Sequence, residues 1–194
     1  MKRFTFVNSL IKEHGYKTYL EIGVLFGDSM NMVECERKIG VDPDPVRIPL
    51  CCEFHRETSD EFFAHWKETV DIVFIDGDHE AHQVMRDVEN SLLVLSENGT
   101  IVLHDCNPPT EESQLPERPK DIRAWHGDAW KAIVELRGRH GLEVYTIDAD
   151  SGLGVVRFAP GRKADIECYS IHHLTWPMLK KDRKRLLGLR GARR

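Results

Sequence analysis

The sequence predicts a doubly wound α/β fold with a mostly parallel sheet and an antiparallel hairpin at its C-terminal edge. Short apolar runs alternate with helical patterns, which is typical of parallel strands joined by crossover helices. The run 71–76 is apolar through its middle, as expected for a strand buried on both faces. The five-residue connection 148–152 joins two further apolar runs, and such a short connection predicts the hairpin.

The individual elements follow from hydrophobic periodicity and from glycine, proline and capping residues. Helices are expected at residues 4–17, about 29–37, from 58 onward, about 81–95 and 125–137. Strands are expected at 18–22, 38–41, 50–54, 71–76, 100–104, 142–147 and 154–158, with a turn at 97–99. The proline-rich segment from 107 to about 119 is longer than a plain connection. It is interpreted either as a lid or substrate-contacting loop, or as a disordered insertion.

Composition indicates one globular domain over residues 1–194. The chain is 41% hydrophobic and 30% charged, and a chain of this length can bury a substantial core. Its five cysteines are odd in number and show no C-x-x-C spacing, which favours reduced thiols. No apolar run approaches the roughly 18 residues of a membrane helix. We therefore expect a soluble cytoplasmic protein without a membrane partner.

Charge is unevenly distributed along the chain. The net charge is −5, yet residues 177–194 contain eight Lys or Arg and one acid. We expect residues 159–194 to form a C-terminal extension with a basic helix or tail. It is either an anion-binding tail or the solvated face of a terminal helix, and the second interpretation is favoured. The acidic remainder argues against a general nucleic-acid binder, and a homo-oligomer stays open.

The stretch 19–29 predicts a ligand-binding loop. A short strand passes through Gly23 and Gly27 into a helix that begins near Asp28, and such a loop brings backbone close to a ligand. Asp42 follows Gly23 by 19 residues, the spacing at which a carboxylate can bind ribose hydroxyls. The loop lacks the third glycine of G-x-G-x-x-G, and Glu21 would repel a pyrophosphate. A cofactor with an amino group and no phosphate fits better.

Polar residues also end the other predicted strands. Asp76 ends one strand, and His104 and Asp105 end the next. Ligands of open α/β sheets bind at these carboxyl ends. Adjacent strands lie about 4.8 Å apart, so Asp76 and Asp105 can converge. Two such carboxylates either bind a cation or share a proton.

Over most of residues 16–158 the chain resembles the class I S-adenosylmethionine-dependent methyltransferases, whose fold is Rossmann-like. Most similar are small-molecule O-methyltransferases with the pattern Ile75-Asp76-Gly77-Asp78-His79 and a polar pair such as His104-Asp105. The resemblance implies roles for the cofactor-binding residues. Glu21 and Gly23, with Gly27 in the same motif, would face the amino acid end of the cofactor, Asp42 the ribose, Ser59 or Asp60 the adenine, and Asp76 the methionine part.

The resemblance also implies two routes for removing a proton from the acceptor. Many relatives hold Mg²⁺ at these strand ends, which here would make Asp76, His104 and Asp105 the ligands. Histidine is a poorer Mg²⁺ ligand than a carboxylate, so the metal is one alternative. His79 as a general base is the other. Alternatively, His79 has a structural role and caps the following helix or orders the loop. A metal site formed by His79 with His82 is disfavoured.

We therefore expect a methyltransferase that moves a methyl group from S-adenosylmethionine to a hydroxyl of a small molecule, such as a sugar or natural product. His79, Asp76 and Asp105 would carry the chemistry, with Mg²⁺ optional. The alternatives are an N-methyltransferase of the same fold, a noncatalytic cofactor-binding module and a nicotinamide enzyme. The remaining candidates are interpreted structurally: His126, His172 and His173 as surface or packing residues, and Trp125, Trp130 and Trp176 as core or substrate-wall residues.

Overall fold

The computed structural model describes residues 1–121 and 124–192, which form a mixed α/β fold around one eight-stranded sheet. The strands are β1 (Thr18–Ile22), β2 (Arg37–Val41), β3 (Glu53–His55), β4 (Val70–Ile75), β5 (Leu95–Leu103), β6 (Leu142–Asp148), β7 (Leu153–Phe158) and β8 (Leu189–Gly191). The helices are α1 (Arg3–His14), α2 (Asp28–Met32), α3 (Ser59–His65), α4 (Ala81–Val94), α5 (Trp130–Arg137) and α6 (Trp176–Leu187). Two short 3-10 turns lie at Glu112–Gln114 and Ile171–His173.

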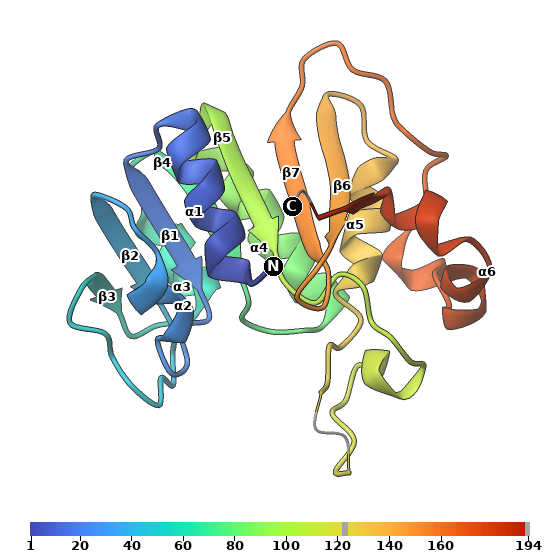
Figure 1. Ribbon diagram of the computed structural model, residues 1–194, viewed down its shortest axis with the longest axis horizontal. Helices are drawn as coiled ribbons and strands as arrows, with labels where there is room; N and C mark the ends of the chain where they lie inside the picture. Colours follow the sequence, from blue (N-terminus) through green and yellow to red (C-terminus); the bar gives the residue numbers. More distant parts are fainter. Residues whose placement is uncertain (122–123, 193–194) are drawn as a thin grey trace.

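The sheet has the strand order β3-β2-β1-β4-β5-β7-β6-β8 (Figure 1). Strands β1 to β5 pair in parallel, and β7 runs antiparallel to both β5 and β6. The predicted fold class, including the antiparallel C-terminal strands, is therefore confirmed. The hairpin does not form the sheet edge, because β8 pairs in parallel with the outer side of β6.

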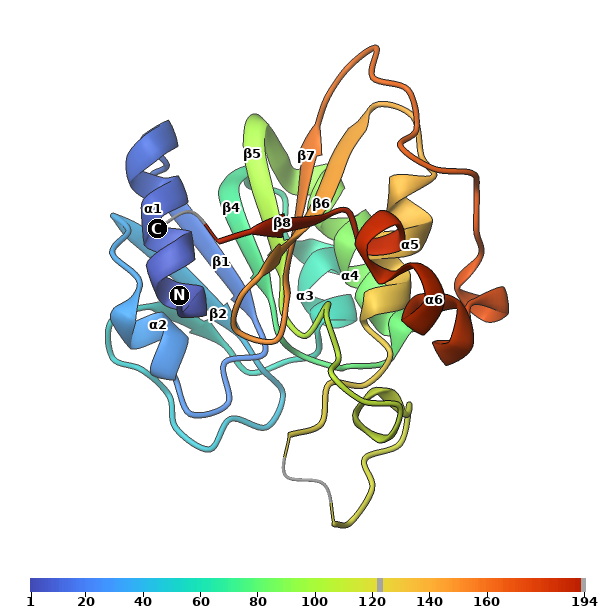
Figure 2. The same cartoon turned by 45° about the vertical axis from the view of Figure 1, so that its right-hand side comes forward.

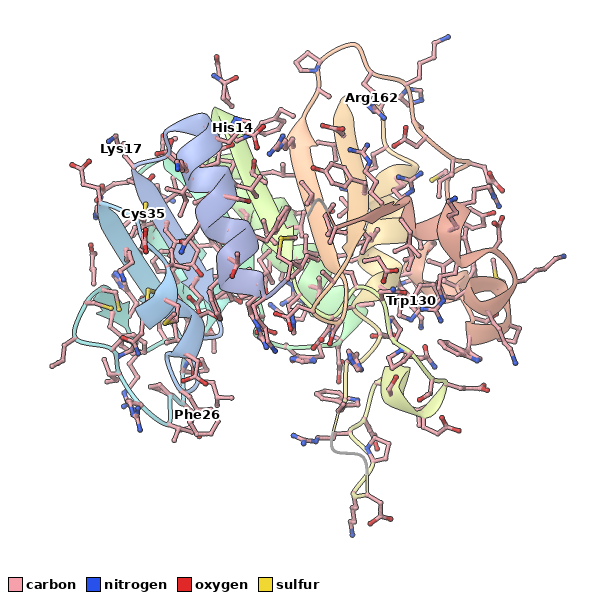
Figure 3. All side chains as sticks on the ribbon, viewed as in Figure 1. His14, Lys17, Phe26, Cys35, Trp130 and Arg162 are labelled. Carbon is pink, nitrogen blue, oxygen red and sulfur yellow. The ribbon has the colours of Figure 1, made fainter. Side chains whose placement is uncertain are left out.

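The sheet is covered by helices on both faces, and its strand residues alternate between two cores (Figures 1 and 2). Tyr19 belongs to the core on the α1 face, whereas its neighbour Leu20 belongs to the core on the other face, which also contains residues of α3, α4, α5 and α6. This alternation is the period-two geometry of a strand. Figure 3 shows Trp130 in the interior beside β6 and Phe26 at the outer edge of the molecule, where its side chain is half exposed.

Several predicted boundaries were wrong. Helix α1 ends at His14 rather than at 17, because Gly15 follows with a φ of +68°, and β3 is Glu53–His55 rather than 50–54. Helix α2 ends at Met32 rather than near 37, because Arg37 already pairs with Thr18 at the start of β2. The turn expected at 97–99 is part of β5, whose pairing with β4 shifts irregularly in this region. Helix α5 begins at Trp130 rather than at 125, because the preceding residues 124–126 line a cavity instead.

The C-terminal residues form α6 followed by β8. Leu179 and Leu186 of α6 are buried in the core on the α5 side, while most of its basic side chains are exposed. Arg193 and Arg194 of the expected basic tail lie outside the described residues. No helix in the described ranges is both long enough and apolar enough to cross a bilayer.

Gly23, at the end of β1, sits against the end of β4. Its φ is +88°, and a Cβ atom there would lie 2.3 Å from the carbonyl oxygen of Asp76. An L side chain would therefore be opposed both by its own backbone conformation and by a fixed backbone neighbour. This contact holds the glycine loop against the Asp76 segment.

We expect Gly23→Ala to destabilise the protein more than Gly15→Ala. Gly15 has a similar φ of +68°, and nothing lies within 4 Å of the place that a Cβ atom would take there, so its substitution isolates the backbone cost. That cost is about 1–2 kcal/mol, and the clash at Gly23 should add about 1–3 kcal/mol. Urea denaturation of both variants measures the difference, and equal losses would contradict the close approach.

Candidate active site

A cavity of about 1000 Å³ opens at the carboxyl ends of the parallel strands. Its wall includes the glycine loop, the first residues of α1, the start of α3, and residues 124–126. Nine residues singled out from the sequence line it: Glu21, Gly23, Asp42, Ser59, Asp60, Asp76, His79, His104 and Asp105. Gly27 lies beside the cavity rather than in its wall, where it precedes α2 with a φ of +75°.

Glu21 is a buried carboxyl group in the floor of this cavity. Only 2% of the residue is exposed, and the hydroxyl of Tyr19 donates a hydrogen bond of 2.6 Å to its Oε2. Burial raises the pKa of Glu21 to about 8. A cationic ligand group beside it would favour the ionised form, so the residue is suited to binding an amino group.

Asp42 ties the end of β2 to the glycine loop. Its Oδ2 accepts a hydrogen bond from the backbone N–H of Leu25, and its Oδ1 accepts one from Asp44, both at 2.8 Å. Leu25 has a φ of +47°, so this carboxylate stabilises a loop in an unfavourable conformation. A carboxylate has about four lone-pair sites, which leaves acceptor capacity for a ligand hydroxyl.

Two polar residues at the start of α3 form another part of the wall. Ser59 donates a hydrogen bond of 2.6 Å to Asp87 of α4, and burial raises the pKa of Asp87 to about 6. Asp60 instead pairs with Arg86, with 2.5 Å between Oδ2 and Nη1. Thr58 and Glu61 fix this segment, because they form a reciprocal capping box at the N-terminus of α3.

Asp76 and Asp105 lie at the ends of β4 and β5, with His104 between them. The Nδ1 atom of His104 is 3.1 Å from Oδ1 of Asp76 and 3.2 Å from Oδ1 of Asp105. Burial opposes a charge on His104, but the two carboxylates outweigh it and raise its pKa to about 10. Burial likewise opposes a charge on Asp76, yet His104 and Arg3 lower its pKa overall.

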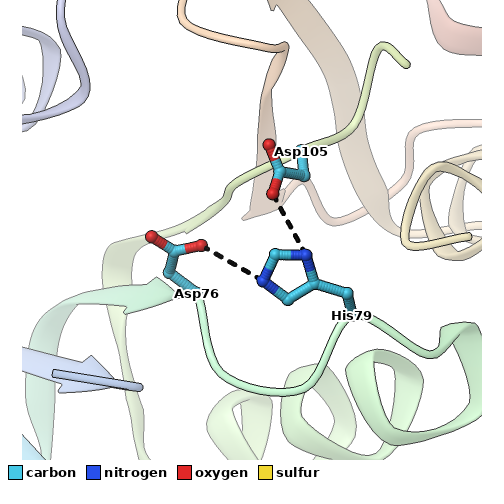
Figure 4. Close-up of side chains that lie close together, drawn as sticks. All are labelled: Asp76, His79 and Asp105. Atoms are coloured by element: carbon cyan, nitrogen blue, oxygen red, sulfur yellow. Dashed lines mark ion pairs between the residues drawn. The ribbon is translucent and has the colours of Figure 1, made fainter. Parts of the chain in front are cut away.

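His79 lies between the same two carboxylates (Figure 4). Its Nδ1 is 3.2 Å from Oδ2 of Asp105, and its Nε2 is 3.9 Å from Oδ1 of Asp76. The ring also stacks on Trp125, with centroids 4.8 Å apart and planes 5° from parallel. His79 does not cap α4, because Asp128 accepts the hydrogen bond from the first helical N–H at 2.6 Å.

Four cavity residues were not assigned to the site from the sequence, or were only weakly indicated. Arg3 and Asp150 come from distant elements and carry no motif. Trp125 was one of several candidates for a substrate wall. His126 was expected at the surface or in packing, but it is 4% exposed and its Nε2 lies 3.8 Å from Asp105. His82, by contrast, is largely exposed and pairs with Glu80.

The donors at the strand ends do not fit Mg²⁺ well. Ligand atoms of Asp76, His79 and Asp105 lie within 4.8 Å of one another, and the predicted ligand His104 is a second imidazole in the same cluster. Mg²⁺ prefers oxygen ligands in octahedral geometry, whereas imidazoles occupy two of these four positions. These four residues therefore suit the predicted Mg²⁺ poorly.

The sequence itself carries the signature of a known domain type. Residues 20–106 match the family model described as a methyltransferase domain. This match covers the glycine loop and the ends of β4 and β5. A comparison with curated proteins gives no match.

Solved structures of methyltransferases share the fold. The SAH-bound (S-adenosylhomocysteine) methyltransferase PaMTH1 of Podospora anserina is 14% identical with a TM-score of 0.63, covering 81% of this chain and 78% of that chain. The O-methyltransferase TomG of Streptomyces achromogenes, solved with SAM and involved in tomaymycin synthesis, is 12% identical with a TM-score of 0.61, covering 81% and 79%. The N-methyltransferase NodS of Bradyrhizobium japonicum is 17% identical with a TM-score of 0.55, covering 80% and 93%.

We expect Glu21→Gln to flatten the pH dependence of stability. The folded-state pKa of about 8 lies above the value of 4.5 for an unhindered glutamate. The unfolded chain therefore releases this proton first, and the free energy of unfolding falls as pH rises from about 4.5 to 8. Between pH 5 and 9 the free energy of unfolding of the wild type should fall by on the order of 3 kcal/mol more than that of the variant.

Urea denaturation across this pH range measures the effect. Glu36→Gln is the matched control, because the Glu36 side chain is 72% exposed and pairs with the equally exposed Lys17. It should leave the wild-type pH dependence unchanged. Parallel curves for Glu21→Gln and wild type would contradict the raised pKa.

Proposed function

We propose that this protein transfers the methyl group of S-adenosylmethionine to a hydroxyl oxygen of a small molecule, such as a sugar or another polyhydroxylated compound. The observation that carries the proposal is the position of His79. Its imidazole reaches into the cavity beside Asp105, while Glu21 and the glycine loop line the cavity end toward β1. The proposed base and the proposed cofactor-binding residues thus line one cavity.

In this proposal the cofactor would lie along the strand ends from β1 to β3. Glu21 would accept hydrogen bonds from the amino group of the methionine part, and Gly23 would let the backbone approach it. Asp42 would bind the ribose hydroxyls with its remaining lone pairs. Ser59 or Asp60 would contact the adenine. The burial of Glu21 supports this placement, because a cationic amino group would relieve the cost of ionising it.

His79 would act as the general base. The acceptor hydroxyl would lose its proton to the imidazole as its oxygen attacks the methyl carbon. An O–C bond forms as the C–S bond of the sulfonium breaks, and the sulfur keeps the bonding electron pair. The products are the methyl ether and S-adenosylhomocysteine. Asp105 would stabilise the imidazolium, and Trp125 would keep the ring in place.

The paired base favours oxygen over nitrogen as the acceptor atom. An amine is already nucleophilic when neutral, so an N-methyltransferase has less need of a carboxylate-supported base. A noncatalytic binding module would not need one at all. The five cysteines are all free thiols, which supports the further proposal of a reducing compartment such as the cytoplasm.

We expect S-adenosylmethionine to bind the purified protein and to raise its melting temperature. Asp42→Asn should weaken the affinity by about tenfold, because an amide offers fewer acceptor sites for two ribose hydroxyls. Asp44→Asn is the matched control, because it removes a neighbouring exposed carboxylate that lies outside the cavity wall. It should change the affinity by less than about twofold, as expected for a surface substitution. Isothermal titration calorimetry measures both variants. Equal affinities of the two variants for S-adenosylmethionine would contradict the assignment of Asp42 to the ribose.

We expect His79→Gln to lower kcat by about 10²–10⁴-fold while leaving cofactor affinity nearly unchanged, because the residue removes a proton only during the reaction. The assay follows S-adenosylhomocysteine release and label transfer from methyl-labelled cofactor to a panel of phenols, catechols, sugars and amines. His82→Gln, which removes an exposed imidazole three residues along, should retain wild-type rates. Label appearing on amines alone would replace the proposed acceptor with a nitrogen.

A further inference from the structure

The carboxylates of Asp76 and Asp105 need a counter-charge, because neighbouring carboxylates in a buried cleft repel each other. We propose that the side chains of Arg3 and His104 are that counter-charge, and that no divalent metal binds between the two aspartates. The catalytic role of this assignment rests on the function proposed above. The assignment itself names the positively charged groups of the same site. Arg3 and His104 are positioning residues, because they act through the aspartates.

His104 occupies the place that a bridging metal would need. Its Nδ1 faces Oδ1 of Asp76 at 3.1 Å and Oδ1 of Asp105 at 3.2 Å. The side chain is 7% exposed and directly follows β5, so the strand holds the ring in position. A metal bound to the same two oxygens would have to displace the proton on this nitrogen.

Arg3 engages the other oxygen of Asp76. Its Nη1 lies 2.5 Å from Oδ2, at the opposite end of the carboxylate from His104. Asp150, in the turn between β6 and β7, holds Arg3 at two points. Its Oδ2 accepts the backbone N–H of Arg3 at 2.6 Å and lies 3.3 Å from Nε. Both oxygens of Asp76 are therefore engaged by the protein's own donors.

The charges at the site come close to balance without a metal. Asp76, Asp105 and Asp150 supply three negative charges, and His104 and Arg3 supply two positive charges. A divalent ion added to this set would leave an excess positive charge in a largely buried cleft, where an uncompensated charge is costly.

The test is metal binding measured by calorimetry with Mg²⁺, Mn²⁺ and Zn²⁺, with no acceptor required. We expect no saturable binding to the wild type up to millimolar metal. His104→Asp replaces the imidazole with a third carboxylate and should bind Mn²⁺ at least about tenfold more tightly than the wild type, because an oxygen-rich set suits such ions. His173→Asp adds the same charge at an exposed position and should bind no metal.

Arg3 provides a second test at a partly exposed position, in case a third buried carboxylate prevents folding. Arg3→Gln removes the charge from Asp76 and should allow Mn²⁺ to bind, whereas Arg3→Lys keeps the charge and should behave as the wild type. Lys2→Gln is the control, because Lys2 approaches only Asp150, at 3.9 Å.

Stoichiometric metal binding by the wild type, or no difference between Arg3→Gln and Arg3→Lys, would overturn the inference. Titration of the same samples with S-adenosylmethionine separates the two proposals. If the wild type does not bind S-adenosylmethionine, the proposed function is refuted. If the wild type binds the cofactor and also binds metal, only the assignment of Arg3 and His104 as the counter-charge is refuted.

Discussion

Two carboxylates meet where β4 and β5 end, and the structure depends on how their charges are neutralised. Parallel pairing of Ile75 with Leu103 places Asp76 level with His104, and Asp105 follows one residue later. Carboxylate oxygens of the two aspartates lie within 4.8 Å of each other. His104 enters between them from β5, and Arg3 reaches them from the first turn of α1. Each contact joins segments that are distant in sequence. Electrostatic neutralisation at this point therefore also fastens the N-terminal helix and the β6–β7 turn to the sheet.

The same strand end couples the two halves of the cleft. Gly23 packs against the backbone of Asp76, so the glycine loop and the segment that carries Asp76 are in direct contact. Glu21, beside this loop, is a carboxyl group whose ionisation is opposed by burial. A buried acid of this kind costs the folded protein stability above its unfolded pKa. Loss of folding stability of this kind is typical of functional sites, where a charged group serves to bind a ligand and not to stabilise the fold.

The long connection between β5 and α5 contributes to the wall of the cavity. Its 3-10 turn is pinned to the body, because the N–H of His126 donates to the carbonyl of Ser113 and the indole of Trp130 donates to Gln114. Trp125 then stacks on His79, and His126 lies near Asp105. Residues 122–123 of this connection are outside the described structure. The described part places two aromatic rings beside the acidic pair.

The sequence by itself determined the fold class, the order of strands along the chain and the polar residues at their carboxyl ends. These features are local: apolar runs, glycine positions and strand-end acids can all be read within a few residues. What Asp76 and Asp105 contact was decided only by the tertiary structure. Arg3, Asp150 and His126 belong to no sequence motif. Sequence spacing also does not show whether His104 binds a metal ion or donates a hydrogen bond to a carboxylate. Long-range packing decides these pairings, because the charges that neutralise a buried carboxylate come from whichever elements the sheet brings to its end.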